Sequence, residues 1–428
     1  MKKKLSLPTR ILIALVLGVA VGILLDFVPP SFFRDRLLVD GLFLAAGKIF
    51  INAFRMMVVP IVFVSLTLGI AAMNSPQSLG RIGAKTIGFY LGTTVFAIVI
   101  GLAVAVIFSP GTGLDPARVG AAAEAAAPQM EQSMLDTLID VVPQNPIRAF
   151  AGDSMLQIIF LAIVSGLALS MLGEKAPRLR EILNELNLFN IRIIEMIMHF
   201  APYGVFCLLA RTFATLGATA LLPLVKFLIC IAFGMALQLF VVYGGMLKVL
   251  GRLNVRAFFR KFAPVMMVAF STSSSNATLP TNIETLVKRM GVSERLATLL
   301  LSLGATINMD GTAIMQGCGA VFIAQLYGIE LSVAQMATIV VTATLASIGT
   351  AGVPGVGVLM LAMVLQSVNL PMEGIAVIMG VDRLVDMMRT TVNISGDAVC
   401  ACVIAVSERE LDPAVYNNPA AGEESLQS

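Results

Sequence analysis

Long hydrophobic runs, separated by short charged or Pro- and Gly-rich breaks, fill the first 250 residues of the chain. Each run is near or above the roughly 20 residues that a helix needs to cross a lipid bilayer. The pattern predicts six helices over residues 11–29, 41–73, 82–108, 147–173, 188–216 and 220–250. The first run follows a Lys-rich start but lacks the small-residue cleavage pattern of a signal peptide. We therefore interpret it as the first transmembrane helix.

The pattern changes after residue 261, where small polar residues interrupt two apolar segments, at 271–280 and at 347–357. Irregular backbone survives at membrane depth only where it is buried in protein or lines a polar cavity, because lipid cannot pair with free N–H and C=O groups. We predict that each segment is a helical hairpin that enters the membrane and returns to the same side. A flexible linker is the alternative for the serine-rich segment. Two more spans are expected over 294–325 and 372–406.

Lysine and arginine are concentrated in alternate connections between the predicted spans. They lie at the start of the chain and after the second, fourth and sixth spans: Lys2, Lys3, Lys4 and Arg10, then Arg81 and Lys85, then Lys175, Arg178 and Arg180, then Lys248, Arg252, Arg256, Arg260 and Lys261. By the positive-inside rule these connections are cytoplasmic. We expect a multi-pass protein of the plasma (inner) membrane with both termini in the cytoplasm. The stretch 109–146 is then external, and we interpret it as a solvated linker without a function of its own.

Composition excludes several classes of function. Hydrophobic residues make up 57% of the 428 residues, charged residues only 13%, and the mean hydropathy is +0.90, which fits a chain surrounded by membrane lipid. The net charge of +3 is spread along the chain and Trp is absent, so we expect no nucleic-acid partner. His199 is the only histidine, and the five cysteines lie in apolar segments without metal-ligand spacing. We therefore expect neither a disulfide framework, nor a zinc site, nor an enzyme.

The last predicted span carries most of its polar side chains on one face. An arc of roughly 100° holds Asp382, Asp386, Arg389, Thr390, Asn393 and Asp397. Four charges facing lipid would cost on the order of 10 kcal/mol, so they must pair with each other, with ions or with a substrate. A structural salt bridge between Asp386 and Arg389 is one explanation, because the two residues are three apart. The other is a binding site in which Arg389 offers its planar fork to a carboxylate and an aspartate binds an ammonium group.

The seventh predicted span contains a second polar group. Asn308, Asp310 and Thr312 alternate around Gly311, which weakens the helix, and local unwinding there would expose backbone carbonyls. Carboxylate, carbonyl, amide and hydroxyl oxygens are the ligands that hard cations prefer. The sequence therefore predicts that Asp310 and Asp397 are cation ligands. Gln316, about one turn beyond Thr312, is uncharged and offers no titratable proton carrier at that position.

Four motifs together resemble the dicarboxylate/amino acid:cation symporters, a family that includes glutamate and aspartate transporters. In chain order they are Ser273, Ser274 and Ser275 with Thr278, Leu279 and Pro280; Asn308, Met309, Asp310, Gly311 and Thr312; Gly352, Val353, Pro354 and Gly355; and the stretch 386–397. Residues 56–60 and 90–94 also look like the family, so the resemblance covers essentially the whole chain.

The resemblance implies an all-α polytopic membrane protein with eight transmembrane helices and two re-entrant helical hairpins, built from inverted repeats. It implies a homotrimer that works as an elevator-type transporter, with the second hairpin as the outer gate. Residues 1–250 would be mainly a scaffold and trimerisation region, to which the third and sixth helices are exceptions because they join the transport domain. Residues 251–408 would form the core transport region, and 409–428 a cytoplasmic tail.

The resemblance also implies the members of the site. Substrate would contact Ser274, Ser275, Thr312, Val353, Gly357, Asp386, Arg389, Thr390 and Asn393, with Arg389 reading the side-chain carboxylate. Sodium would bind at three places: the first formed by Gly304, Asn308, Asn393 and Asp397, the second by Thr306, Ser347, Ile348 and Thr350, and the third by Tyr90, Thr93, Thr94, Asn308 and Asp310. Beyond the coupling cation, Na⁺ or H⁺, we expect no cofactor.

The sequence thus predicts a secondary active symporter that imports glutamate or aspartate with Na⁺. A proton-coupled glutamate or C4-dicarboxylate symporter is the alternative, and an anion channel or a neutral amino acid carrier is less favoured. The neutral carrier is disfavoured because family members that carry neutral amino acids tend to lack a positive residue at the place of Arg389. Family members often carry a further arginine at the place of Ser273 or of Met387, and this chain has none at either. Arg383 is the nearest substitute, although helical spacing puts it just outside the polar arc.

Overall fold

The computed structural model describes residues 7–73, 81–113, 141–152, 155–348, 356–419 and 421. Helices make up nearly all of this part of the chain, and the β-contact within it is an isolated bridge between Val292 and Leu411. The tip of the second predicted hairpin, with Thr350, Gly352, Val353, Pro354 and Gly355, lies outside the described residues, as does most of the predicted external stretch 109–146.

The first half of the chain forms helices where membrane helices are predicted, except that the predicted helix 147–173 is two helices, α7 (Pro146–Ala151) and α8 (Met155–Leu172). The other bounds are α1 (Leu7–Asp26), η1 (Phe32–Phe43) continuing into α2 (Leu44–Met73), α3 (Arg81–Phe108), α9 (Pro177–His199), α10 (Ala201–Leu216), and α11 (Leu221–Ala236) continuing through η4 (Leu237–Tyr243) into α12 (Gly244–Val249). Among the described residues, six helices are long and apolar enough to cross a membrane, and the bent pair α9 and α10 adds a seventh.

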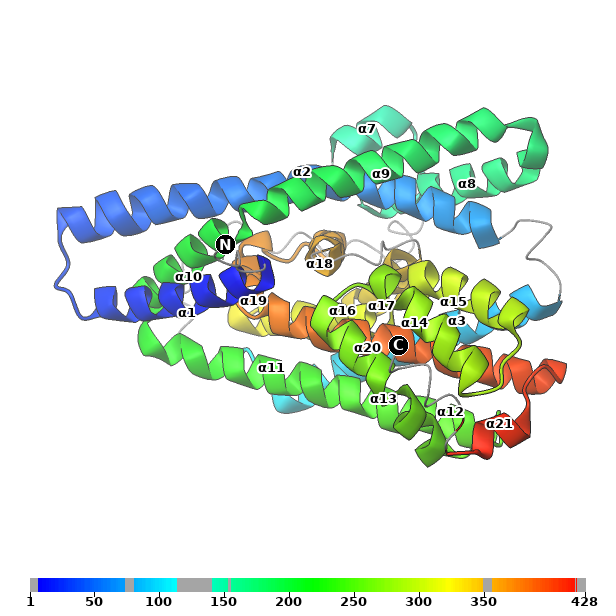
Figure 1. The fold of residues 1–428 in the computed structure, drawn as a ribbon. Coiled ribbons are helices and arrows are strands. Elements are labelled where there is room, and N and C mark those ends of the chain that lie inside the picture. The colour runs from blue at the N-terminus through cyan, green and yellow to red at the C-terminus, as the bar shows by residue number, and fades with distance from the viewer. Residues whose placement is uncertain are drawn as a thin grey trace, which may run out of the picture.

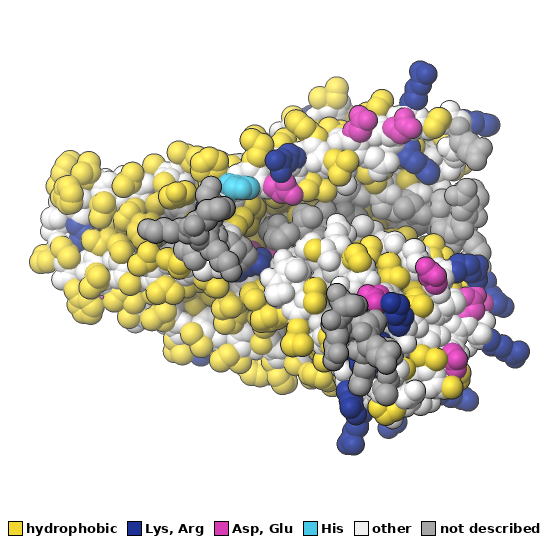
Figure 2. Space-filling view, in the orientation of Figure 1, with side chains coloured by type: hydrophobic (Ala, Val, Ile, Leu, Met, Phe, Trp, Pro, Cys, Tyr) yellow, Lys and Arg dark blue, Asp and Glu magenta, His cyan; other side chains and the backbone are white. Residues whose placement is uncertain are grey.

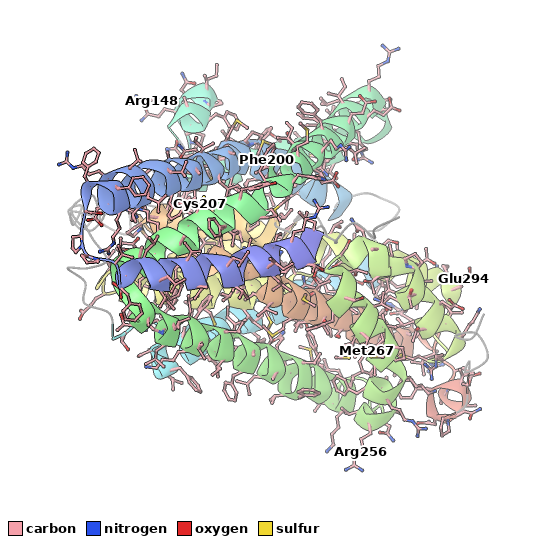
Figure 3. The ribbon with its side chains drawn as sticks, turned by 60° about the vertical axis from the view of Figure 1, so that its left-hand side comes forward. Arg148, Phe200, Cys207, Arg256, Met267 and Glu294 are labelled. Carbon is pink, nitrogen blue, oxygen red and sulfur yellow. The ribbon has the colours of Figure 1, made fainter. Side chains whose placement is uncertain are left out.

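One predicted helix, 188–216, is wrong in its bounds and its shape. The structure has two helices, α9 and α10, bent by 54° at Phe200 (Figure 3). Pro202 lies in the first turn of α10, where a proline fits because it lacks the N–H that a continuous helix would need. The hydrophobic pattern does not detect the first residues of α9, because they are largely charged.

The second half contains both broken elements. Its helices are α13 (Val255–Thr272), α14 (Ser275–Lys288), α15 (Glu294–Ile307), α16 (Asp310–Leu326), α17 (Val333–Ser347), α18 (Val356–Ser367), α19 (Ile375–Met379), α20 (Asp382–Glu408) and α21 (Pro413–Asn417). The first hairpin is the pair α13 and α14, which meet where Ser273 takes a left-handed conformation (φ 53°) and Ser274 caps α14. The second pairs α17 with α18.

Two spans differ in detail from the prediction. The seventh is α15 and α16, and its break falls at Asn308 and Met309 rather than at Gly311. The last span, expected over 372–406, begins as a 3₁₀ turn at Met372–Gly374 and the short α19, and the long helix starts only at Asp382. The average hydrophobicity of each span does not detect these breaks, because longer apolar stretches lie on both sides of the few polar residues.

The helices pack in two groups (Figure 1). In one, α2 packs against α8 and α9, and α1 lies along α10. In the other, α20 is surrounded by α13, α14, α15, α16 and α11, and α3 lies against α16. The approach of α3 to α16 is close, because a Cβ added at Gly101 would lie 2.7 Å from the backbone oxygen of Ile314. The third and sixth helices thus pack with the helices that carry the predicted site.

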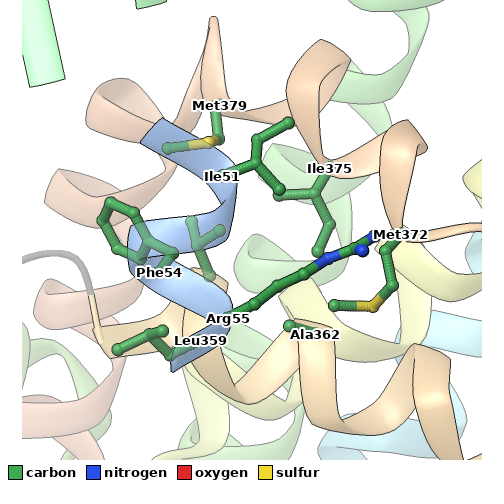
Figure 4. Close-up of a pocket in the computed structure, with 9 residues that line it drawn as sticks. Ile51, Phe54, Arg55, Leu359, Ala362, Met372, Ile375 and Met379 are labelled. Carbon is green, nitrogen blue, oxygen red and sulfur yellow. The ribbon is translucent and has the colours of Figure 1, made fainter. Parts of the chain in front are cut away.

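Contacts between the two groups include one ion pair and a small apolar pocket. Arg55 on α2 contacts Glu373, just before α19, at 3.2 Å between Nη2 and Oε1. The pocket beside it is lined by side chains from α2, α18 and α19, among them Phe54, Leu359 and Met379 (Figure 4). That one group slides past the other remains a prediction.

Basic side chains gather at one end of the molecule. Figure 2 shows them at one end of the visible face, whereas the opposite end is largely hydrophobic. At the charged end, Glu408 of α20 accepts from Lys85 (2.7 Å) and Arg81 (2.5 Å) at the start of α3. Such clustering is what the positive-inside rule requires of the predicted cytoplasmic face.

The first residues of the predicted C-terminal tail are docked rather than free. The buried Lys261 donates from Nζ to the carbonyls of Arg289 (2.6 Å), Val415 (2.8 Å) and Tyr416 (2.8 Å), which ties α21 to the base of the first hairpin. Hydrogen bonds from Ser293 and Arg295 hold the pKa of Glu410 below its ordinary value. The contacts of Glu410 with Ser293 and Arg295 therefore stabilise the fold at a pH above the ordinary pKa of a glutamate. This stabilisation is lost as the pH falls through the lowered pKa of Glu410.

Candidate functional site

The polar face of α20 is buried inside the second group of helices. Asp386, Arg389, Thr390, Asn393 and Asp397 are each no more than 4% exposed. The prediction that this face is turned inward is therefore confirmed for these five residues, whereas Asp382, at the start of the helix, is partly buried. Because buried charges need partners, the contacts of each side chain show which groups are paired within the protein and which can bind a substrate or an ion.

Asp386 and Arg389 pair directly. Oδ1 of Asp386 accepts from Nε of Arg389 at 2.8 Å and lies 2.6 Å from Nη2. The remaining terminal nitrogen, Nη1, faces the sulfur of Met315 at 3.8 Å, which is a weak acceptor. The guanidinium therefore keeps one edge that can bind a stronger anion such as a carboxylate.

Gly357, at the start of α18, lies directly over this guanidinium. A Cβ at Gly357 would overlap Nη1 of Arg389, so the close approach requires glycine. The second hairpin thereby covers the arginine side chain. Val353, the other predicted substrate residue of this hairpin, lies outside the described residues.

The start of α16 completes this part of the site. Asn393 Oδ1 accepts from the backbone N–H of Gly311 at 2.7 Å, and its Nδ2 lies 3.5 Å from the hydroxyl of Thr312. Thr390 donates to the backbone oxygen of Asp386 at 2.8 Å. The structure thus brings together Thr312, Gly357, Asp386, Arg389, Thr390 and Asn393, six of the nine predicted substrate residues.

The serines of the first hairpin lie on a neighbouring element. Ser275 is buried, and Ser274 accepts from the N–H of Ala277 at 3.2 Å as the cap of α14. The hairpin packs against α20, where Asn282 Nδ2 lies 3.5 Å from the backbone oxygen of Ile394. That both serines contact substrate remains a prediction.

Asp310 is fully buried and held by three neutral donors. Thr94 donates to Oδ1 at 2.8 Å, and Tyr243 and Gln238 donate to Oδ2 at 2.7 and 2.9 Å. The sequence pattern indicates Thr94 but not Gln238 and Tyr243, which both lie in η4, in the middle of the sixth helix. An amide inside an otherwise apolar span was the available signal for Gln238.

Tyr243→Phe tests this network. We expect the free energy of unfolding to fall by about 1.5–3 kcal/mol, because the change removes a hydrogen bond to a buried charged group. Thermal unfolding in detergent measures the effect. Tyr203, which is 72% exposed on α10, gives the matched control Tyr203→Phe. An equal stability of the two variants would exclude a structural role for the Tyr243 hydroxyl.

Asn308 joins Asp397 to Thr93 of α3. Its Nδ2 donates to Oδ1 of Asp397 at 2.9 Å, and its Oδ1 lies 3.5 Å from the hydroxyl of Thr93. A Cβ at Gly304 would overlap Oδ1 of Asp397 and would lie 2.6 Å from the hydroxyl of Tyr90, so α15, α20 and α3 meet here. The residues of the first and third predicted sodium sites are therefore neighbours in one network.

The described members of the second predicted sodium site make hydrogen bonds within their own helices. Thr306 is exposed and donates to Leu303 within its own helix, and Ser347 is buried and donates to Thr344. Ile348 follows at the end of α17, and Thr350 lies outside the described residues. This site remains a prediction.

The donor set around the two aspartates suits a hard cation. Among the described residues, no three His, Cys, Asp or Glu side chains gather as a transition-metal site requires. Single carboxylates with hydroxyl, amide and carbonyl oxygens are instead the ligands of alkali and alkaline-earth cations.

The chain is similar to a known family of membrane symporters over nearly its whole length. The sodium:dicarboxylate symporter family matches residues 7–407. A proton/glutamate-aspartate symporter of Escherichia coli (strain K12) is 37% identical over 417 residues, which cover 96% of this chain and 94% of that protein. A proton/sodium-glutamate symport protein of Geobacillus stearothermophilus is 33% identical, with 94% of each chain covered. A C4-dicarboxylate transport protein of Bacillus subtilis (strain 168) is 32% identical, with 97% and 96% covered.

Proposed function

The chain belongs to the sodium:dicarboxylate symporter family, and on this premise we propose that it imports glutamate or aspartate across the cell membrane together with Na⁺. Membership makes it a multi-pass symporter of the glutamate and dicarboxylate class. The buried pair of Asp386 and Arg389 is the observation that carries the choice of substrate.

An acidic amino acid fits this pair by charge. Its side-chain carboxylate can bind the free edge of Arg389, at Nη1, and its ammonium group can bind Asp386, so both buried charges stay paired in the complex. A neutral amino acid would leave Arg389 without an anion. The glutamate-aspartate symporter among the relatives supports the same substrate.

The membrane potential makes cation coupling necessary. Glutamate and aspartate carry a net charge of about −1, so a potential that is negative inside opposes their uptake by about 2.3 kcal/mol per 100 mV. One cation only cancels this term, and a second turns the potential into a driving force. Asp310 and Asp397 provide two buried carboxylates in one oxygen-lined network, which supports the uptake of more than one cation.

Sodium is our first choice of ion, because Thr94 and Tyr243 bring uncharged hydroxyl oxygens to the carboxylate of Asp310. The proton-coupled relatives support H⁺ as the alternative. We also propose that the second hairpin closes over the substrate at Gly357, that the protein is a homotrimer working as an elevator in the inner membrane, and that both termini are cytoplasmic.

Counterflow in proteoliposomes tests the substrate. Vesicles loaded with unlabelled aspartate or glutamate are expected to take up labelled aspartate transiently, because a carrier exchanges substrate across the membrane and a channel does not. Internal alanine is the matched control and is expected to support no exchange. Equal exchange with alanine would contradict acidic selectivity, and the absence of any counterflow would contradict a carrier.

A further inference from the structure

Asp386 lies between two guanidinium groups. Oδ1 contacts Arg389, as described, and Oδ2 accepts from Nη1 of Arg383 at 3.3 Å. Each arginine is three residues from the aspartate, one on either side, and Arg383 is only 7% exposed. The prediction from helical spacing, which put Arg383 just outside the polar face, is corrected by its long side chain, which reaches back to Asp386.

The cluster has a balanced charge and spare hydrogen-bonding capacity. Asp382 and Asp386 offset Arg383 and Arg389 when all four are ionised. Within the described residues, Oδ1 of Asp382 and Nε of Arg383 are buried without a hydrogen-bond partner. The two carboxylates and the two guanidinium groups can therefore exchange partners with one another while all four stay paired within the cluster.

Substrate binding adds a negative charge to this cluster. A substrate carboxylate on the free edge of Arg389, at Nη1, shares that single guanidinium charge with Asp386, which holds Nε and Nη2. Leaving a buried charge only partly compensated is unfavourable, so Asp386 needs a second cation at that moment. An acidic amino acid brings an ammonium group, whereas a dicarboxylate brings none.

Arg383 is already in contact with the other oxygen of Asp386. We propose that Arg383 is a specificity-determining residue that keeps Asp386 paired while Arg389 binds substrate, so that the site accepts C4 dicarboxylates as well as acidic amino acids. This inference rests on the proposed function and widens its substrate class. Arg383 acts through Asp386 and so is a positioning residue.

The test compares aspartate with succinate in the wild type and in Arg383→Gln. Glutamine keeps a donor for Asp386 but removes the charge. We expect the wild type to transport both acids. In Arg383→Gln the half-saturating concentration of succinate should rise at least about tenfold, as for a buried charge that loses its partner. That of aspartate should change less than about threefold, because its ammonium replaces the lost charge.

Two further variants keep the result interpretable. Arg383→Lys restores a positive charge and is expected to recover succinate transport in part. Arg192→Gln is the matched control, because Arg192 pairs with Glu195 at the same three-residue spacing but is largely exposed. It should leave both substrates unchanged. Retained aspartate transport shows that Arg383→Gln is folded. If Arg383→Gln does not fold, aspartate and succinate are compared in Arg383→Lys and the wild type instead.

The outcomes separate this inference from the proposed function. An equal loss of aspartate and succinate in an Arg383→Gln protein that elutes as folded from size-exclusion chromatography would overturn the specificity role, and so would a wild type that transports aspartate but never succinate. A wild type that transports neither acid would instead overturn the proposed function itself.

Discussion

Arg389→Ala is expected to abolish uptake of glutamate and aspartate, with a loss of at least about 100-fold in kcat/KM. Truncating one partner of a buried, hydrogen-bonded charge pair costs about 2–5 kcal/mol or more, and here the lost group is also the proposed anchor of the substrate carboxylate. Arg389 is 3% exposed, and its fork is held by Asp386 at 2.6 and 2.8 Å. Initial rates of labelled aspartate uptake in proteoliposomes measure the effect.

Arg389→Lys separates the lost fork from the lost charge. Lysine keeps the positive charge beside Asp386 but offers a point charge without two parallel donors, so we expect it to remain folded and to transport acids poorly. Size-exclusion chromatography in detergent checks the fold of both variants. Aspartate kinetics in Arg389→Ala that match the wild type would remove this residue from the site.

Asp397→Asn is expected to weaken the dependence of transport on the cation at least about tenfold. The substitution keeps an oxygen for Asn308, which now donates to Asp397 at 2.9 Å, but it removes the negative charge that a hard cation prefers. Aspartate uptake measured against Na⁺ concentration gives the half-saturating value, and the prediction is a shift to higher concentration.

Asp40→Asn makes the same chemical change away from the site. Asp40 forms an exposed pair with Arg211, at 3.2 Å, on the other group of helices. Its loss should leave the Na⁺ dependence unchanged, since exposed pairs contribute little. If Asp397→Asn behaved like Asp40→Asn, the cation role of Asp397 would be refuted.

The broken segments and the polar face of α20 could be predicted from the sequence, because the membrane penalises both so strongly. Polar runs inside apolar segments have few solutions in lipid, and helical pairs are the one that α13 with α14 and α17 with α18 adopt. Charges at regular helical spacing must face inward, as Asp386 and Asp397 do. These rules act on residues that are close together in sequence.

Partners that come from distant segments could not be predicted in the same way. Tyr243 reaches Asp310 from 67 residues away, and nothing in the periodicity of the sixth helix selects it. Helical spacing puts Arg383 outside the polar face because it describes Cα positions. The side chain of Arg383 is nevertheless long enough to reach Asp386 on that face. The bend at Phe200 depended on local proline geometry rather than on hydrophobicity.

Gradient-driven accumulation of labelled aspartate tests Na⁺ symport most directly. Purified protein in sealed liposomes is given either an inward Na⁺ gradient at equal pH or an inward proton gradient without Na⁺, with the membrane potential clamped in both. A tenfold gradient supplies about 1.4 kcal/mol for each coupled ion. We predict that aspartate accumulates above its external concentration with the Na⁺ gradient and not with the proton gradient alone. Accumulation that follows the proton gradient and ignores Na⁺ would contradict sodium coupling, and no accumulation under either gradient would contradict symport.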